Sequence, residues 1–327
     1  MVRLDVNRRT ATTKTDEVLQ VVARKDPKAL YELAPGTPGL AGVVLLHQME
    51  GFMDAGGAGR LASEHLLDQF DHRLVASFDV DRLIDYRSRR PTMTFDKDHY
   101  DHYEDPALDL HLLTDGAGKR FLLLDGLEPD REWELFALAV RSLVEHFDVS
   151  ITVGMHGIPM GIPHTRPLGI TAHATNPGLV DTTDQPVLDR LQVPSSAASL
   201  LEYRLGEWGH DAAGFAVHVP HYLASSLYPQ AAIRLLRSVS EATGLVLPDV
   251  ELRDAARRAS EDIERQVQES SEVEDVVRAL ERQYDAFNVT DRKNLLSDND
   301  GRMPTADELA AEFERFLADQ DGPPPSP

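Results

Sequence analysis

The chain has 327 residues, a formal net charge of −22, 42% hydrophobic residues and no cysteine. This length predicts one large α/β domain plus a smaller appendage, and the apolar content is sufficient for a core. The acidity argues against nucleic acid and anionic membrane surfaces as partners, because both are negatively charged. The lack of cysteine excludes disulfides, thiol nucleophiles and cysteine-ligated metals.

Neither a membrane anchor nor a leader is expected. The sequence has no run of about 18 apolar residues, as a membrane helix would need. Its first residues, MVRLDVNRRTATTK, lack the apolar stretch of a secretory signal. We therefore expect a cytoplasmic protein, with disordered segments at residues 1–20 and 320–327.

The first half of the chain alternates strand-like and helix-like segments. Residues 54–70 predict a helix with Asp54 at its N-cap. A DGAG turn between two apolar runs predicts a hairpin. The predicted strands are 42–47, 74–79, 108–113 and 120–126.

The second half continues the alternation. A helix is predicted over residues 128–147, with Pro129 in its first turn. Strands rich in Val, Ile and Leu that alternate with helices predict an α/β fold with a mixed, largely parallel central sheet and flanking helices. The predicted strands here are 150–155, 169–175 and 214–220, and the predicted helices are 195–209 and a segment ending near 243.

The pattern changes after residue 246. Residues 21–246 are assigned to the α/β domain and residues 247–319 to a C-terminal helical appendage. Ser271 and Glu274 form a predicted capping box for its second helix, and Thr305 and Glu308 form another for a third. The short link between the first two helices predicts an antiparallel pair.

Residues 155–167, MHGIPMGIPHTRP, follow directly on a predicted strand. Three prolines and two glycines predict a stiff loop that ends the strand. The carboxyl edge of parallel strands is where open α/β sheets bind ligands, so His164 and Arg166 are candidates for binding an anion or a partner's carboxylate. The alternative is that Arg166 holds the loop in place through an internal acid or backbone carbonyls.

The segment DYRSRRP, residues 85–91, is the most basic window of this acidic chain. Its Arg87, Arg89 and Arg90 are candidates for phosphate binding, although pairing with acids inside the fold or an oligomer is favoured. Two histidine pairs, His99 with His102 and His218 with His221, are weak metal signals without a third ligand. No metal site and no cofactor are predicted.

The glycines at the start of the first helix match a dinucleotide fingerprint on spacing alone. Gly57, Gly59 and Ala62 fit G-x-G-x-x-A, but HQMEGFMD separates them from the preceding strand. Asp54, Gly56 and Gly57 therefore remain general ligand-binding candidates, with helix capping and packing as the alternative. His47 and Glu50 lie nearby and are candidate acids or bases by location only.

Other catalytic signatures are missing from the sequence. It contains no G-x-S-x-G, no G-x-x-x-x-G-K-[ST] and no H-E-x-x-H. No catalytic residue is assigned, and whether the protein is an enzyme stays open.

Two segments carry a resemblance to a known family. The segment VVLLHQMEGFMDAGGAGRLASEHL resembles the start of PAC2-family domains, and LLDGLEPDREWELFALAVRSLVEHFDVSITVGMHGIPMGIPHTRP resembles their second half. The resemblance spans residues 40–225 and is closest to the actinobacterial branch, which adds a C-terminal helical region.

The resemblance implies a fold like that of nucleoside phosphorylases and two kinds of activity. The first is a non-enzymatic protein-binding or assembly-chaperone-like role, with a proteasome-related partner. The second is binding of a nucleoside or a small anion such as phosphate, with or without catalysis. A homo-oligomer is expected, with a trimer favoured by analogy. The chain ends in PPPSP and so lacks the hydrophobic-Tyr-any tail of some eukaryotic assembly chaperones.

Overall fold

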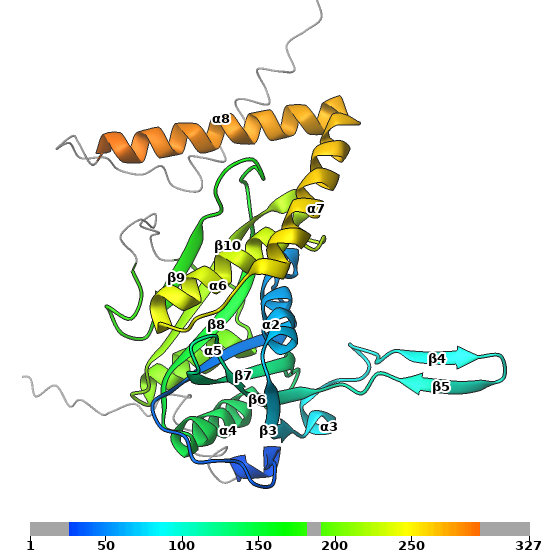
Figure 1. The fold of residues 1–327 in the computed structure, drawn as a ribbon, viewed down its shortest axis with the longest axis vertical. Helices are drawn as coiled ribbons and strands as arrows, with labels where there is room; N and C mark the ends of the chain where they lie inside the picture. The colour runs from blue at the N-terminus through cyan, green and yellow to red at the C-terminus, as the bar shows by residue number, and fades with distance from the viewer. Residues whose placement is uncertain (1–25, 182–190, 295–327) are drawn as a thin grey trace, which may run out of the picture.

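A computed structural model of the chain describes residues 26–181 and 191–294, with side chains of the last helix described as far as Ala286. A central sheet between two helical layers forms the body. One hairpin projects from its side, and two helices lie at one end (Figure 1). The predicted disordered ends and the predicted third appendage helix lie outside the described residues.

The strands form one large sheet and one separate hairpin. They are β1 (Tyr31–Leu33), β2 (Val43–Glu50), β3 (His72–Phe78), β4 (Met93–Asp96), β5 (His99–Tyr103), β6 (Leu108–Thr114), β7 (Arg120–Leu127), β8 (Val149–Met160), β9 (Ile170–Ala174) and β10 (Ala212–Pro220). The large sheet of the described residues has eight strands in the order β1-β3-β6-β7-β2-β8-β10-β9. Its central strands β7, β2, β8 and β10 are parallel, and the outer strands pair antiparallel. The predicted fold class is confirmed.

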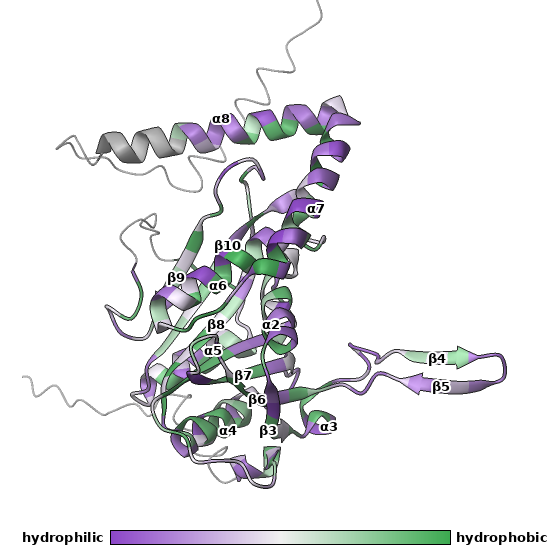
Figure 2. Ribbon diagram, viewed as in Figure 1, coloured by the Kyte–Doolittle hydropathy of each residue, from purple (hydrophilic) through white to green (hydrophobic). Residues whose placement is uncertain are grey.

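Helices cover both faces of the sheet. They are α2 (Ala58–Gln69), α3 (Val80–Leu83), α4 (Trp133–His146), α5 (Ala197–Glu207), α6 (Pro229–Thr243), α7 (Val250–Gln268) and α8 (Ser271–Asn294), with 3-10 turns η1 (Pro27–Leu30), η2 (Ala55–Gly57) and η3 (His221–Leu223). One core lies between the sheet and the α4–α5 layer, and a second lies between the sheet and the α2–α6 layer. Figure 2 shows apolar residues gathered in this body.

Strand β2 explains why the sheet needs both layers. Its Leu45 and Met49 belong to the α4–α5 core, whereas Val44 and Leu46 belong to the α2–α6 core. Successive side chains of a strand point to opposite faces, so a strand buried on both faces has a continuous apolar run. The sequence VVLL reflects this double burial.

Strand β8 is longer than predicted. The prediction that the strand ends at Met155 is wrong, since β8 continues to Met160 through Pro159 and stays paired with β10. The amide of Gly157 donates to Asp54 Oδ1 at 2.9 Å, on the edge away from β10. Pro159 lies two residues further on, so its nitrogen faces the same edge and removes no ladder hydrogen bond.

Helix α4 begins at Trp133, five residues later than predicted. The residue before it, Glu132, adopts φ 54°, and Pro129 lies outside the helix and accepts a hydrogen bond from Trp133 Nε1 at 2.5 Å. The prediction that Pro129 occupies the first turn is therefore wrong. Glu128 and Asp130, which fall inside the predicted helix, precede α4 and make tertiary contacts.

The hairpin β4–β5 was not predicted. All nine residues of its two strands are exposed, and Figure 1 shows it projecting away from the body. The alternation of apolar and polar residues in MTFD is only four residues long, and an extra residue, Asp101, interrupts it in β5.

The C-terminal helices begin close to where the appendage was predicted. The amide of Val273 donates to Ser270 Oγ at 3.4 Å, so Ser270, one residue before the predicted Ser271, caps α8. Figure 1 shows α8 turning away from α7, so the predicted antiparallel pair does not form. No helix within residues 26–181 and 191–294 is long and apolar enough to span a bilayer.

Gly59 tests how closely α2 packs on the sheet. A Cβ at this position would lie 2.6 Å from the carbonyl oxygen of Met155. Helix propensity alone favours Gly59→Ala by about 1 kcal/mol, but overpacking typically costs about 1–3 kcal/mol. We expect Gly59→Ala to lower the free energy of unfolding in urea. Gly39→Ala is the control, because a Cβ there meets nothing within 4 Å, and equal stability of the two variants would contradict the packing argument.

Candidate functional site

A cavity of about 420 Å³ lies between the sheet and α5, from the middle of β2 and β8 toward their carboxyl ends and over the first residues of β10. Side chains of Met49, Phe52, Ile158 and Ala198 give it apolar walls. Its polar lining consists of His47, His156, His173, Glu128 and Glu202. This is the edge of the sheet at which the sequence predicts a site.

Two glycines create the floor of this cavity. Strand registers place His47, Gly154, Gly214 and His173 in one row across β2, β8, β10 and β9. A Cβ on Gly154 would lie 2.8 Å from His47 Cε1, and a Cβ on Gly214 would lie 2.2 Å from His173 Cε1. The two imidazoles therefore lean over bare backbone, and any larger residue in the middle of the row would displace them.

His47 and His156 occupy the cavity as uncharged rings. Burial is the largest influence and lowers the pKa of each to about 4, outweighing the opposing attraction of Glu202. His47 is 4% exposed. Neither ring has a hydrogen-bond partner among the described residues. Both rings line the cavity.

Helix α5 forms the opposite wall. Glu202 on this helix pairs with His173, with Oε1 2.8 Å from Nδ1. The helix is held by Arg204, whose guanidinium binds both oxygens of Glu134 on α4, at 2.9 and 2.6 Å. The Arg204 side chain is 6% exposed. This bidentate ion pair fixes α5 over the cavity.

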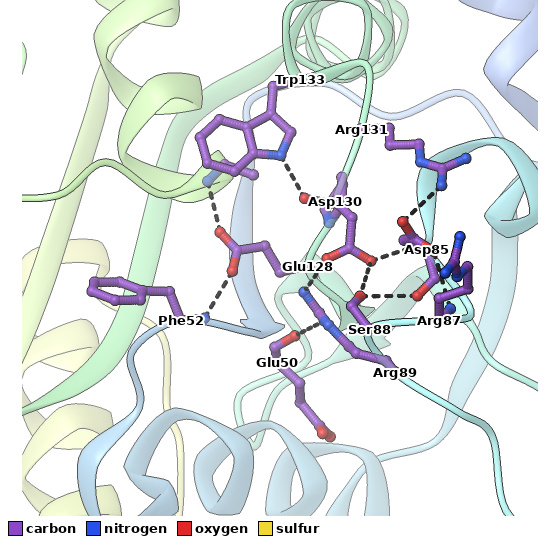
Figure 3. A network of polar contacts seen from close by, with 12 residues as sticks. Glu50, Phe52, Asp85, Arg87, Ser88, Arg89, Glu128, Asp130, Arg131 and Trp133 are labelled. Atoms are coloured by element: carbon purple, nitrogen blue, oxygen red, sulfur yellow. Dashed lines mark hydrogen bonds and ion pairs between the residues drawn. The ribbon is translucent and has the colours of Figure 1, made fainter.

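Glu128 joins three segments at the edge of the cavity (Figure 3). Its carboxylate accepts hydrogen bonds from the amide of Phe52 at 2.8 Å and from that of Ala197, the first residue of α5, at 2.7 Å. Gly51 makes room for it, since a Cβ there would lie 1.8 Å from Glu128 Oε2. The glycine of the GF segment is thus required by a buried carboxylate 77 positions further along the chain.

The lining restricts what the cavity can hold. None of the described residues that line it is lysine or arginine. The described part of the chain has no group of three or more His, Cys, Asp or Glu side chains able to hold a metal ion. Neutral imidazoles can still exchange hydrogen bonds with a ligand, each with one donor and one acceptor.

The predicted candidates near α2 have packing roles. Asp54 accepts hydrogen bonds from the amides of Gly59, Arg60 and Gly157, and so joins α2 to β8. Gly56 and Gly57 adopt φ of 70° and 57°, which favour glycine. A separate hollow of about 270 Å³ touches Asp54 and Gly57, on the face of the sheet opposite the histidines.

The basic segment lies at the base of the hairpin (Figure 3). Arg89 pairs with Asp130 at 3.1 Å and donates to the carbonyl of Glu50 at 2.6 Å. The amide of Arg87 donates to Asp85 Oδ1 at 3.0 Å, and the side chains of Arg87 and Arg90 are exposed. Arg89 therefore pairs with an acid inside the fold, as the sequence analysis favoured over phosphate binding.

His164 and Arg166 contact other parts of their own chain. Both the amide and Nδ1 of His164 meet Tyr222 Oη, at 2.8 and 2.7 Å. Arg166 pairs with Asp285 at 2.7 Å and with Glu281 at 3.1 Å, both on α8. Figure 1 shows α8 far from the hairpin, so Arg166 and the basic segment do not form one site.

Sequence reasoning named His47 by location and missed His156, His173 and Glu202. A signal was present in the two glycines inside otherwise apolar strands, because such glycines often mark close approach by another group. Only the strand register shows that both belong to one row.

The fold and cavity together define a three-layer α/β protein with a hollow at the edge where such sheets bind ligands. The sequence profile of the PAC2 family matches residues 48–267. The chain belongs to the PAC2 family, as its sequence resemblance implied. No curated protein matches it.

Several solved structures of similar proteins come from actinobacteria. The Mycobacterium tuberculosis protein of unknown function Rv2714 is 50% identical, with a TM-score of 0.77 over 80% of this chain and 93% of that one. A Corynebacterium glutamicum protein of unknown function is 41% identical, with a TM-score of 0.75 over 80% and 98%. The M. tuberculosis proteasome-assembly chaperone homologue Rv2125 is 24% identical, with a TM-score of 0.65 over 72% of this chain and 100% of that one. At this identity the likeness shows a shared fold alone.

Replacing the Glu128 carboxylate tests its joining role. In Glu128→Gln, an amide NH₂ opposes one of the two backbone donors, and we expect the free energy of unfolding to fall by about 1–3 kcal/mol. Hydrogen exchange at the amides of Phe52 and Ala197 should accelerate. Glu64→Gln, at a carboxylate 52% exposed, is the control. Unchanged exchange at both amides would contradict the assignment.

The buried histidines predict an acid-sensitive stability. The unfolded chain protonates each near pH 6.5, but the folded protein does so only near pH 4. Between these values the unfolded state binds more protons, so the free energy of unfolding falls as pH is lowered, by up to about 1.4 kcal/mol per pH unit for each histidine.

Urea unfolding from pH 7 to pH 4 measures this slope. We expect it to be shallower in His47→Phe and in His156→Phe than in the wild type. His99→Phe, at a side chain 61% exposed, should leave the slope unchanged. Identical slopes for the wild type and both buried-site variants would show that these rings do not remain uncharged on folding.

Proposed function

We propose that the protein is a non-enzymatic, chaperone-like factor that binds another protein, and that hairpin β4–β5 is its docking element. The observation that supports this most directly is the hairpin's projecting apolar face. Met93, Phe95, Tyr100 and Tyr103 are 49%, 59%, 67% and 38% exposed. An isolated two-stranded hairpin is only marginally stable in water, so a partner that covers this face would also stabilise it.

A register shift gathers these side chains on one face. Met93 is opposite Tyr103 and Phe95 is opposite Tyr100, although the two tyrosines are three positions apart. The shift leaves Asp101 as an extra residue on β5, which restores the alternation so that both tyrosines lie on the same side. The rings of Phe95 and Tyr100 pack edge to face with centroids 5.2 Å apart.

The base of the hairpin is fixed to the body. Asp130 accepts from the amide of Asp85 at 2.7 Å and pairs with Arg89 (Figure 3). Asp85 in turn pairs with Arg131 at 2.8 Å. The hydrogen bond from Arg131 is the largest influence on the pKa of Asp85 and lowers it. A fixed base presents the apolar face in one orientation, which reduces the entropy cost of docking.

The proposed partner is a proteasome-related protein. The support is the relation to Rv2125, which is a proteasome-assembly chaperone homologue. Asp96, Asp98 and Asp101 surround the apolar face, so the partner surface should be an apolar groove with a basic rim. A homo-oligomer, with a trimer favoured by analogy, and a cytoplasmic location also belong to this proposal.

Small-molecule binding is the second candidate function, and the 420 Å³ cavity favours it. The sequence predicts binding of a nucleoside or of phosphate, and the cavity lining disfavours phosphate. Phosphate would find no cationic side chain among the described lining residues. An uncharged ligand meets no such obstacle.

The hairpin proposal is tested with Phe95→Ser/Tyr100→Ser in the full chain. Quantitative mass spectrometry of captures from a native actinobacterial lysate should show a proteasome subunit or assembly factor enriched by the wild type and reduced at least tenfold by the variant. Val273→Ser/Val276→Ser is the control, since these α8 side chains are similarly exposed, at 40% and 49%.

Two results would contradict the proposal. One is equal capture by the wild type and the hairpin variant. The other is recovery of the protein's own chain alone, with a loss of oligomer mass in the variant, which would make the hairpin a contact between copies. Thermal unfolding should differ little among the variants, because exposed substitutions usually change stability by about 0.5 kcal/mol or less.

A further inference from the structure

We propose that the cavity between the sheet and α5 binds an uncharged, largely apolar small molecule whose polar edge both donates and accepts hydrogen bonds, with His47 and His156 as its recognition groups. This inference deepens the second candidate function and does not depend on the hairpin.

The shape of the cavity suits a compact ligand. Its volume of about 420 Å³ lies within the range of about 300–1,000 Å³ typical of small-molecule sites. The imidazoles of His47 and His173 cover Gly154 and Gly214, so these rings form the floor beside a flat ligand. Met49, Ile158 and Ala198 supply apolar contacts around it.

The imidazole of His47 is the strongest indication of a ligand. The residue as a whole is 4% exposed, and its ring makes no hydrogen bond to the described parts of the chain. Its ring nitrogens are not sealed inside the core but are accessible from the cavity. Because the ring lines the cavity, a bound molecule can supply the hydrogen bonds that the protein does not.

His156 provides a second polar contact from the neighbouring strand. It lies on β8 two residues after Gly154, on the same face of the sheet. A neutral imidazole offers one donor and one acceptor, so the two rings together present both kinds of group. A ligand edge that carries both a donor and an acceptor matches this pair.

The charges around the cavity select against ions. An anion would face Glu128 and Glu202 without a lysine or arginine to balance it. A cation would have to share carboxylates that are already engaged, Glu128 by two backbone amides and Glu202 by His173. Desolvating an anion without a counter-charge is costly. An uncharged ligand meets neither obstacle.

Three probes with one ring and different charges test this inference. Benzamide is neutral, with an amide that donates and accepts, whereas benzoate is anionic and benzylamine is cationic. Each is titrated at pH 7.5 into the full-length protein with ¹⁵N-labelled histidine, and the ring-nitrogen resonances of His47 and His156 report binding at this site. We expect benzamide to shift them and the two ions to bind at least tenfold more weakly.

Matched variants assign the contacts. His156→Phe keeps a ring but removes its nitrogens, and should weaken benzamide binding about fivefold, as expected for the loss of one hydrogen bond. His218→Phe is the control, because His218 lies on the same sheet face but is bonded to Thr171 at 2.8 Å. Thermal unfolding confirms that each variant is folded, and a poorly folded His156→Phe would be replaced by His156→Gln, which keeps a polar group.

Three outcomes would overturn the inference: benzoate or benzylamine binding as tightly as benzamide, no shift of the two histidine resonances by benzamide, or equal affinities of the wild type and His156→Phe. The hairpin variant Phe95→Ser/Tyr100→Ser should bind benzamide like the wild type. Failure of the docking proposal and failure of the cavity proposal are therefore distinguishable.

Discussion

The buried carboxylate of Glu128 is the contact on which the arrangement of the cavity depends. It accepts backbone hydrogen bonds from the loop after β2 and from the first turn of α5, and it stands at the end of β7. An anion is favourable at a helix N-terminus, where amides lack partners within the helix. Because Glu128 fills this position, α5 begins directly beside the ends of the central parallel strands.

The cavity results from an omission of side chains in the middle of a packed sheet. On either side of Gly154 and Gly214, the strands carry residues that fill both cores. At this row, two glycines leave the space into which His47 and His173 lean. The imidazoles occupy this space, and the cavity of about 420 Å³ lies beside them, between the sheet and α5. Native cores rarely contain a cavity of this size.

The projecting parts of the chain differ in how they are held. Helix α8 is tied to the body by Arg166, which meets two acids of the helix, and by Tyr284, whose hydroxyl donates to the carbonyl of Pro167 at 3.0 Å. The hairpin β4–β5 is fixed only at its base, and its apolar face meets no other element. The proline-rich loop thus contacts the appendage, while the residues of both hairpin strands are exposed.

The sequence by itself determined the α/β class, most strand and helix positions, the C-terminal helices and the PAC2 family. These depend on local signals, such as the VVLL run of β2 or the serine that caps α5. The sequence also predicts a site at the carboxyl edge of the sheet. It proposed His164 and Arg166 for that site because loop composition is visible in sequence and pairing is not.

Only the tertiary structure decided which residues share the cavity. His47, Gly154, Gly214 and His173 come from four strands, and their common row follows from strand order and register, which no local pattern encodes. Arg166 was assigned to α8 in the same way, by contacts with acids more than 110 positions away. Residues distant in sequence meet because the whole core packs, and that packing is a property of the folded chain.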